Sequence, residues 1–212
     1  MSYSNQKKGM FLAFVGVMFI TPDSLLIRLA NLSSWDLIFY RGIIPFFIVF
    51  IALLIIHKSK FISQLLENSW HGVAYAVIFA ITNIFFVISI NNTNVANTLI
   101  MIALAPMLSA VISFIFLKEN TDQKTWIAII ITTLAVIYIF KDSFERGDVL
   151  GNFLGLICAT GLAIGAAIIR SAKKINLVPS AMMGKLLVAL IAFFFTDNLI
   201  LKENTDQKTW IA

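Results

Sequence analysis

Long runs of hydrophobic residues, separated by short polar segments, extend along almost the whole chain. A helix that crosses a membrane needs about 20 mostly apolar residues, and seven runs approach or reach this length. Within each run the apolar residues are continuous, whereas strands of a membrane barrel alternate over about ten positions. The pattern therefore predicts an all-α, polytopic membrane helix bundle, with helices at residues 9–30, 37–56, 72–91, 97–117, 126–140, 149–169 and 180–200.

The composition supports the bilayer as the solvent. Of the 212 residues, 59% are hydrophobic and 13% are charged, and a soluble domain has no interior large enough for so much apolar side chain. The net charge of +5 therefore concerns orientation in the membrane. It does not indicate a nucleic-acid partner, because the apolar spans leave no continuous basic surface.

Lysine and arginine gather in alternate loops. With the N-terminus inside, nine of these residues lie in inner segments and two in an outer loop. The positive-inside rule then predicts a multi-pass protein of the bacterial inner membrane with a cytoplasmic N-terminus. The inner residues are Lys7, Lys8, Lys58, Lys60, Lys118, Lys124, Arg170, Lys173 and Lys174, and the outer ones are Lys141 and Arg146.

A polar outer loop at residues 141–148 divides the chain into two halves that look related. Similar letters recur at a nearly constant offset: GMFLAF (9–14) and GNFLGL (151–156), Ile27–Arg28 and Ile169–Arg170, and Arg41 and Lys185. Because the first half holds an odd number of spans, a second copy would enter the membrane in the opposite direction. Such inverted repeats, with a site between them, are typical of transporters. The alternative is that two apolar helices share these letters by chance.

The end of the chain repeats an earlier segment. The twelve residues Leu117–Ala128 recur unchanged at Leu201–Ala212. Identity here, beside a repeat that shares only scattered letters, indicates a recent duplication, a recombination joint or an error of gene assembly. We predict that residues from about 197 onward are not native sequence. The second copy would also lie outside, although the first belongs to an inner loop.

Several motifs of the first half resemble the EamA-type unit of the drug/metabolite transporter superfamily. They are Trp35–Arg41, Asn94–Asn97, Ala105–Pro106, Leu117–Glu119 and Trp126. The resemblance implies a carrier of two inverted five-helix units, which moves small metabolites through a central cavity by alternating access. On this interpretation residues 1–140 are a complete first repeat, 141–148 a linker, 149–196 an incomplete second repeat of about two helices, and 197–212 the anomalous tail.

Charged residues inside a membrane span are costly, so they mark candidate residues of the transport pathway. Asp23 follows Pro22, which frees a backbone carbonyl and bends or opens the helix. Its carboxylate suits a proton or cation relay, or alternatively lies at the outer water beside Arg28. Arg41 matches the family's arginine. It can hold a substrate carboxylate or phosphate, or anchor its helix at the lipid headgroups.

Further candidates lie deeper in the chain. Asn83 and Asn91 are eight residues apart, within about a quarter turn of one helix face, where they line a cavity or join helices. Pro106 is expected to bend the fourth helix toward the cavity. Lys185 would face Arg41 across the axis that relates the two repeats. Two cations there favour an anionic or zwitterionic substrate.

These observations predict a secondary transporter of small organic solutes, driven by a coupled proton or by the solute's own gradient. No nucleotide-binding, HExxH or GxSxG motif occurs, so neither a cofactor nor enzyme activity is expected. His57 and His71 have no partners at metal-ligand spacing, so no metal is expected either. Two alternatives remain, a truncated fragment without activity and a half-carrier that functions as a homodimer.

Overall fold

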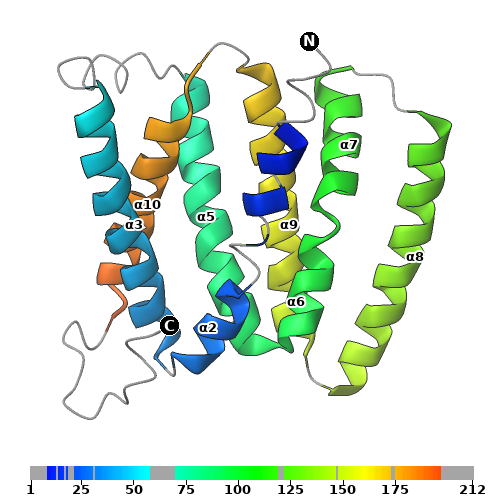
Figure 1. Ribbon diagram of the computed structural model, residues 1–212. Helices are drawn as coiled ribbons and strands as arrows, with labels where there is room; N and C mark the ends of the chain where they lie inside the picture. Colours follow the sequence, from blue (N-terminus) through cyan, green and yellow to red (C-terminus); the bar gives the residue numbers. More distant parts are fainter. Residues whose placement is uncertain are drawn as a thin grey trace.

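The computed structural model describes residues 9–12, 14–16, 18, 22–30, 32–57, 70–118, 122–146, 148–172 and 175–196. All regular secondary structure in these ranges is helical, which confirms the all-α prediction. Figure 1 shows the long helices standing side by side, as in a membrane bundle. The named helices are α2 (Asp23–Leu29), α3 (Ser34–His57), α5 (Trp70–Asn92), α6 (Val95–Ile102), α7 (Ala105–Phe116), α8 (Gln123–Arg146), α9 (Val149–Ser171) and α10 (Val178–Phe193).

Four segments of the described chain are long and apolar enough to cross a membrane. They are Ser34–Ile56, Trp70–Asn92, Val95–Phe116 and Val149–Ser171, and they correspond to the second, third, fourth and sixth predicted spans. The apolar helices Gln123–Tyr138 and Val178–Phe193 are shorter. The structure differs most at the first predicted span, where α2 is a separate helix of seven residues that begins just after Pro22.

The fourth span is interrupted in its middle. Helix α6 ends at Ile102, and α7 starts at Ala105 with Pro106 in its first turn. Proline has no N–H to donate to the carbonyl four residues earlier, which is that of Ile102. The two residues between the helices form a tighter turn, in which the Leu104 N–H donates to the Met101 carbonyl at 3.1 Å. Both pieces pack against α9.

Helix α5 lies at the centre of the packing, with α9 on one side and α10 on the other, and α10 also packs along α3. Glycines permit these close approaches. A Cβ atom added to Gly42 of α3 would lie 2.7 Å from the Ala189 nitrogen of α10. One added to Gly184 of α10 would lie 2.8 Å from the Ala76 carbonyl oxygen of α5. The backbones of α3, α10 and α5 therefore meet at the depth where Arg41 and Lys185 occur.

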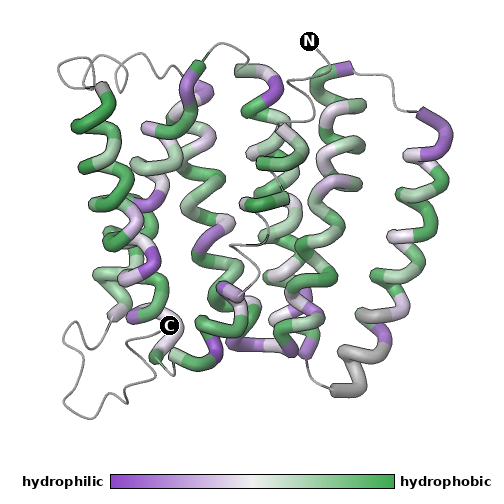
Figure 2. The backbone as a smooth tube through the Cα atoms, in the orientation of Figure 1, coloured by the Kyte–Doolittle hydropathy of each residue, from purple (hydrophilic) through white to green (hydrophobic). Residues whose placement is uncertain are grey.

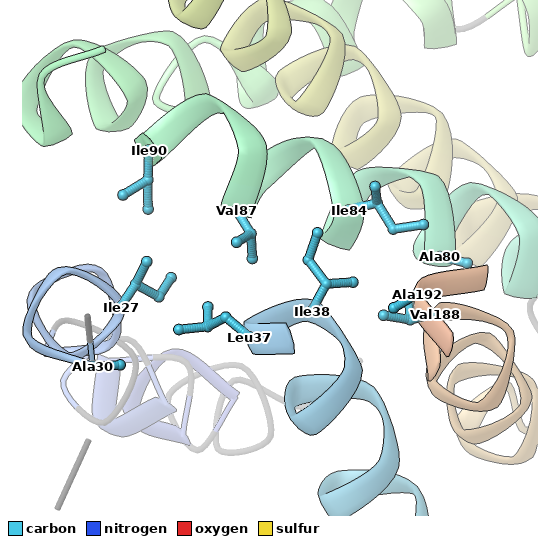
Figure 3. Packing of buried hydrophobic residues seen from close by; sticks show 10 residues of the cluster. All are labelled: Ile27, Ala30, Leu37, Ile38, Ala80, Ile84, Val87, Ile90, Val188 and Ala192. Atoms are coloured by element: carbon cyan, nitrogen blue, oxygen red, sulfur yellow. The ribbon is translucent and has the colours of Figure 1, made fainter. Parts of the chain in front are cut away.

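A cluster of buried apolar side chains fixes α2 against the bundle. Figure 3 shows Ile27 of α2 near Ile90 of α5, with Leu37 of α3 beside Ile27. Ile90 is fully buried and Ile27 is 5% exposed. Because lipid tails are as apolar as these side chains, the contacts stabilise the packing through van der Waals attraction. The short helix α2 is thus held across one end of α3 and α5.

Many large apolar side chains are exposed on the outside of the bundle, and hydrophobic residues, green in Figure 2, predominate along its helices. Ile55 and Ile56 of α3 are each 70% exposed, and Tyr138 of α8 is 76% exposed. So large an apolar exterior is typical of a surface covered by lipid. This agrees with an integral, multi-pass membrane protein.

The helix ends form two opposite faces. The upper end of Figure 1 carries the C-terminal ends of α3, α7 and α9 and the N-terminal ends of α5, α8 and α10. Lys118, Lys124 and Arg170 lie near this end, whereas Thr196 follows α10 at the opposite end. The predicted anomalous tail, residues 197–212, lies outside the described residues.

Candidate substrate-binding site

A bidentate ion pair joins α2 to α3. Both terminal nitrogens of Arg41 donate to the Asp23 carboxylate, Nη1 to Oδ1 and Nη2 to Oδ2, the latter at 2.8 Å. Asp23 opens α2, where the positive end of the helix dipole favours a carboxylate. Arg41 is seven residues into α3, about 10 Å along its axis. The side chains of Arg41 and Asp23 are 27% and 28% exposed, so the pair is not sealed.

A second cation reaches the same region from α10. The Lys185 ammonium donates to the Asn83 side-chain oxygen of α5 at 2.6 Å. The Asn83 amide nitrogen in turn donates to the Phe79 carbonyl at 2.7 Å, which directs its oxygen toward the lysine. Asn83 thus accepts from Lys185 and donates to its own helix.

Two aromatic rings of α5 lie beside the cations. The Lys185 nitrogen is 5.3 Å from the centre of the Phe79 ring, and the Arg41 guanidinium carbon is 5.8 Å from that of Phe86. These are cation–π distances, and the attraction is stronger where water is excluded. Helix α5 therefore offers each cation one aromatic surface.

The charges of the cluster do not balance. Lys185 interacts electrostatically with both Arg41 and Asp23, so the three residues form one charged group. Two cations and one carboxylate leave one positive charge in excess. In a medium of low dielectric such an excess attracts an anion strongly. We call Asp23, Arg41, Asn83 and Lys185 the charged cluster.

The comparison with protein families decides the class of this protein. A model described as the EamA-like transporter family matches residues 7–141, well over half of the chain. The chain belongs to the EamA-like transporter family. Its members are membrane transporters of the drug/metabolite superfamily, which confirms the resemblance found in the motifs. No curated protein and no solved structure matches the chain.

In this EamA-like transporter, the family match includes three of the four residues of the charged cluster. Asp23, Arg41 and Asn83 lie within residues 7–141, and Lys185 lies outside them. The structure shows the ion-pair partner of Asp23. Its partner is Arg41, whereas Arg28 donates to the carbonyls of Ile90 and Thr93 at the end of α5. There the cation meets the negative end of the helix dipole.

Asn91 does not join the charged cluster. It is exposed, and its amide donates to the Ser34 hydroxyl at 2.8 Å. It borders an open, polar hollow of about 810 Å³ at the lower end of the bundle. Asn83 and Asn91, eight residues apart on α5, therefore lie in two different environments. The hollow is lined by Arg28, Asn91, Asn92, Thr93, Asn94, Val95 and Asp148.

The sequence interpretation missed a buried polar network between α5, α6 and α9. The Ser89 hydroxyl shares a hydrogen bond with Thr98 at 2.8 Å and donates to the Gly151 carbonyl at 2.7 Å. Nearby, Thr93 donates to the side-chain oxygen of Asn152, which is fully buried. A polar residue inside an apolar run, such as Asn152, is the signal from which this network could have been predicted. Its satisfied hydrogen bonds indicate that it joins helices.

A third polar contact ties the end of α10 to the start of α3. The Thr196 hydroxyl donates to the buried Asp36 carboxylate, and the rings of Trp35 and Phe195 stack with centres 4.6 Å apart. Asp36 is thus held by a hydroxyl, unlike Asp23, which is held by an arginine. This difference makes Asp36 a useful control for Asp23.

Proposed function

We propose that this transporter is an alternating-access secondary carrier of small organic metabolites that bear a carboxylate, either as anions or as zwitterions. The charged cluster carries the proposal. Its two cations come from helices α3 and α10, and one positive charge is in excess. The excess positive charge attracts a carboxylate, whether the solute is an anion or a zwitterion. The rings of Phe79 and Phe86 suit the apolar part of a solute.

We place the carrier in the bacterial inner membrane with its N-terminus in the cytoplasm. The basic residues Lys118, Lys124 and Arg170 support this orientation, since they lie near the face that would be cytoplasmic. The driving force is a proton gradient or the gradient of the solute. Alternating access requires the cluster to face each side of the membrane in turn.

Uptake into vesicles tests the substrate class. The full chain is reconstituted in liposomes and offered radiolabelled glutamate, leucine, benzoate, glucose and methylamine. We expect saturable uptake of the carboxylates and none of methylamine. Arg41→Gln removes the guanidinium, so uptake at low substrate concentration should fall about tenfold or more. Lys124→Gln, on the exposed first turn of α8, is the matched control and should transport like the wild type.

Saturable uptake of methylamine without uptake of any carboxylate would contradict the proposal. So would full carboxylate uptake by Arg41→Gln. Detergent-corrected light scattering of the same preparation gives its size. It distinguishes a single chain from the homodimer that a half-carrier requires.

A further inference from the structure

We propose that Asp23 is an exchangeable internal ligand of Arg41, and that a substrate carboxylate takes its place while Asp23 binds a proton. The inference rests on the proposed function, which it deepens by naming the coupling ion and the residue that carries it. It makes the protein a proton–carboxylate symporter.

The hydrogen bonds of Arg41 motivate the exchange. Both terminal nitrogens are engaged with the two oxygens of one carboxylate, that of Asp23. A guanidinium matches a carboxylate through two parallel hydrogen bonds along one edge. The site therefore already holds the chemical group that we propose as its ligand. A substrate carboxylate can adopt the same two-bond arrangement only if Asp23 leaves that edge.

The groups around Asp23 determine its charge once it leaves Arg41. Arg41 faces it from α3, and Lys185 of α10 interacts with it electrostatically. On α2 itself, Arg28 is directed to backbone carbonyls at the end of α5. Helix α5 bears no Asp, Glu, Lys or Arg and presents Asn83, Phe79 and Phe86. The one acidic residue of α3, Asp36, accepts a hydrogen bond from Thr196.

These surroundings favour proton uptake during the exchange. Lys185 is already bound to Asn83, and Arg41 would hold the substrate. A carboxylate that has lost its cation takes up a proton where the bound substrate excludes water from it, because an unpaired charge is costly in a medium of low dielectric. One anion enters the cluster and one carboxylate becomes neutral, so the excess charge stays the same. The proton comes from the water on the side from which the substrate enters.

Proton uptake on ligand binding tests the exchange without requiring transport. The purified full chain, in weakly buffered detergent at neutral pH with an indicator dye, is titrated with sodium benzoate. Benzoate bears a single carboxylate on an aromatic body that can contact Phe79 and Phe86. We expect about one proton taken up per bound benzoate, and an affinity that falls about tenfold for each unit rise in pH.

Two variants separate Asp23 from other carboxylates. Asp23→Asn should bind benzoate with no proton uptake and with an affinity independent of pH. Asp36→Asn keeps an oxygen that accepts from Thr196, and it should behave like the wild type. If Asp23→Asn does not fold, infrared difference spectra of the wild type still decide the question. Added benzoate should produce the carbonyl band of a protonated carboxyl group.

The outcomes distinguish this inference from the proposed function. Benzoate binding without proton uptake, without pH dependence and without the infrared band overturns the exchange and leaves a carboxylate carrier. Proton uptake that persists in Asp23→Asn assigns the proton to another group and also overturns it. If neither benzoate, glutamate nor leucine binds, the proposed function fails and the exchange fails with it.

Discussion

At the scale of residues, the two cations of the site are stabilised in the same way. Each has one polar partner and one aromatic ring: Arg41 has Asp23 and Phe86, and Lys185 has Asn83 and Phe79. A lysine or arginine at the centre of a membrane helix costs about 2.5–3.5 kcal/mol on insertion scales. These partners offset part of that cost. They differ in charge, however, and only Lys185 retains a positive charge without a balancing carboxylate.

Replacing Lys185 tests whether this charge holds the substrate. Lys185→Met keeps the length and apolar stem of the side chain but removes the ammonium group. Hydrogen bonds to charged groups contribute about 1.5–3 kcal/mol, so the affinity for a carboxylate should fall roughly 10- to 150-fold. Lys185→Arg keeps the charge, so its affinity for the carboxylate should fall less. Isothermal titration with the carboxylate that the wild type transports best gives these affinities.

A structural defect would mimic this loss, so the variants need a second measurement. Lys185→Met should unfold thermally at a temperature near or above that of the wild type, since it removes a partly buried charge together with its desolvation cost. Weaker binding combined with unchanged melting supports a binding role. Equal affinities of Lys185→Met and the wild type would show that Lys185 does not contribute to substrate binding.

The residues of the site were predictable as candidates, but their pairing was not. Asp23, Arg41 and Lys185 were named as candidates because they are charged residues in apolar runs. Yet Arg41 and Asp23 are 18 residues apart, and Lys185 and Asn83 are 102 apart. Distances of this kind depend on which helices pack together, and an apolar run does not encode that choice. For the same reason Asn83 and Asn91 were grouped on one face, although only Asn83 meets a cation.

At the scale of elements, the length of an apolar run predicted the bounds of a helix well where the helix is uninterrupted. The runs of α3, α5 and α9 were predicted within a few residues of their ends. The predictions were less complete at the prolines. The first run ends in a separate α2 after Pro22, and the fourth divides into α6 and α7 around residues 103–104. A proline shows where a backbone hydrogen bond is missing, but the surrounding packing determines whether the helix bends or stops.

The contact between α9 and α5 allows a matched pair of substitutions at two glycines of α9. A Cβ atom at Gly151 would lie 2.6 Å from the Asn92 carbonyl carbon, which is backbone and cannot rotate away. Gly165 has room, because its nearest neighbour is a Tyr75 ring carbon at 3.6 Å. Gly151→Ala should therefore destabilise the protein by about 1–3 kcal/mol. Gly165→Ala should leave stability unchanged or slightly higher, since alanine favours helix.

Thermal unfolding in detergent, followed by the loss of helical circular dichroism, compares the two variants. Gly151→Ala should melt clearly below Gly165→Ala. Equal melting temperatures would show that α9 can move away from α5 at its N-terminal end without cost. That result would also weaken the importance of the network of Ser89, Thr93 and Asn152, which lies at the same contact.

At the scale of the whole molecule, the bundle has two chemically different ends and an apolar surface between them. Lys118 is exposed where α7 ends, and Asp148 borders the polar hollow at the opposite end. The distribution of lysine and arginine predicts that the end with Lys118 is cytoplasmic. The structure places these residues at opposite ends of the bundle, but its shape is the same in either membrane orientation. The prediction of which end is cytoplasmic therefore rests on the distribution of charges.

Labelling of single cysteines tests this choice. The native Cys158 is buried in α9, and Cys158→Ala removes it as a background site. In that background, Asp148→Cys should react with a membrane-impermeant maleimide in intact cells. Lys118→Cys should react only after the cells are permeabilised. The reverse pattern would show that the N-terminus is outside. A substrate that enters from the cell exterior would then approach the charged cluster from the end distant from α2, and the proton of Asp23 would come from that same side.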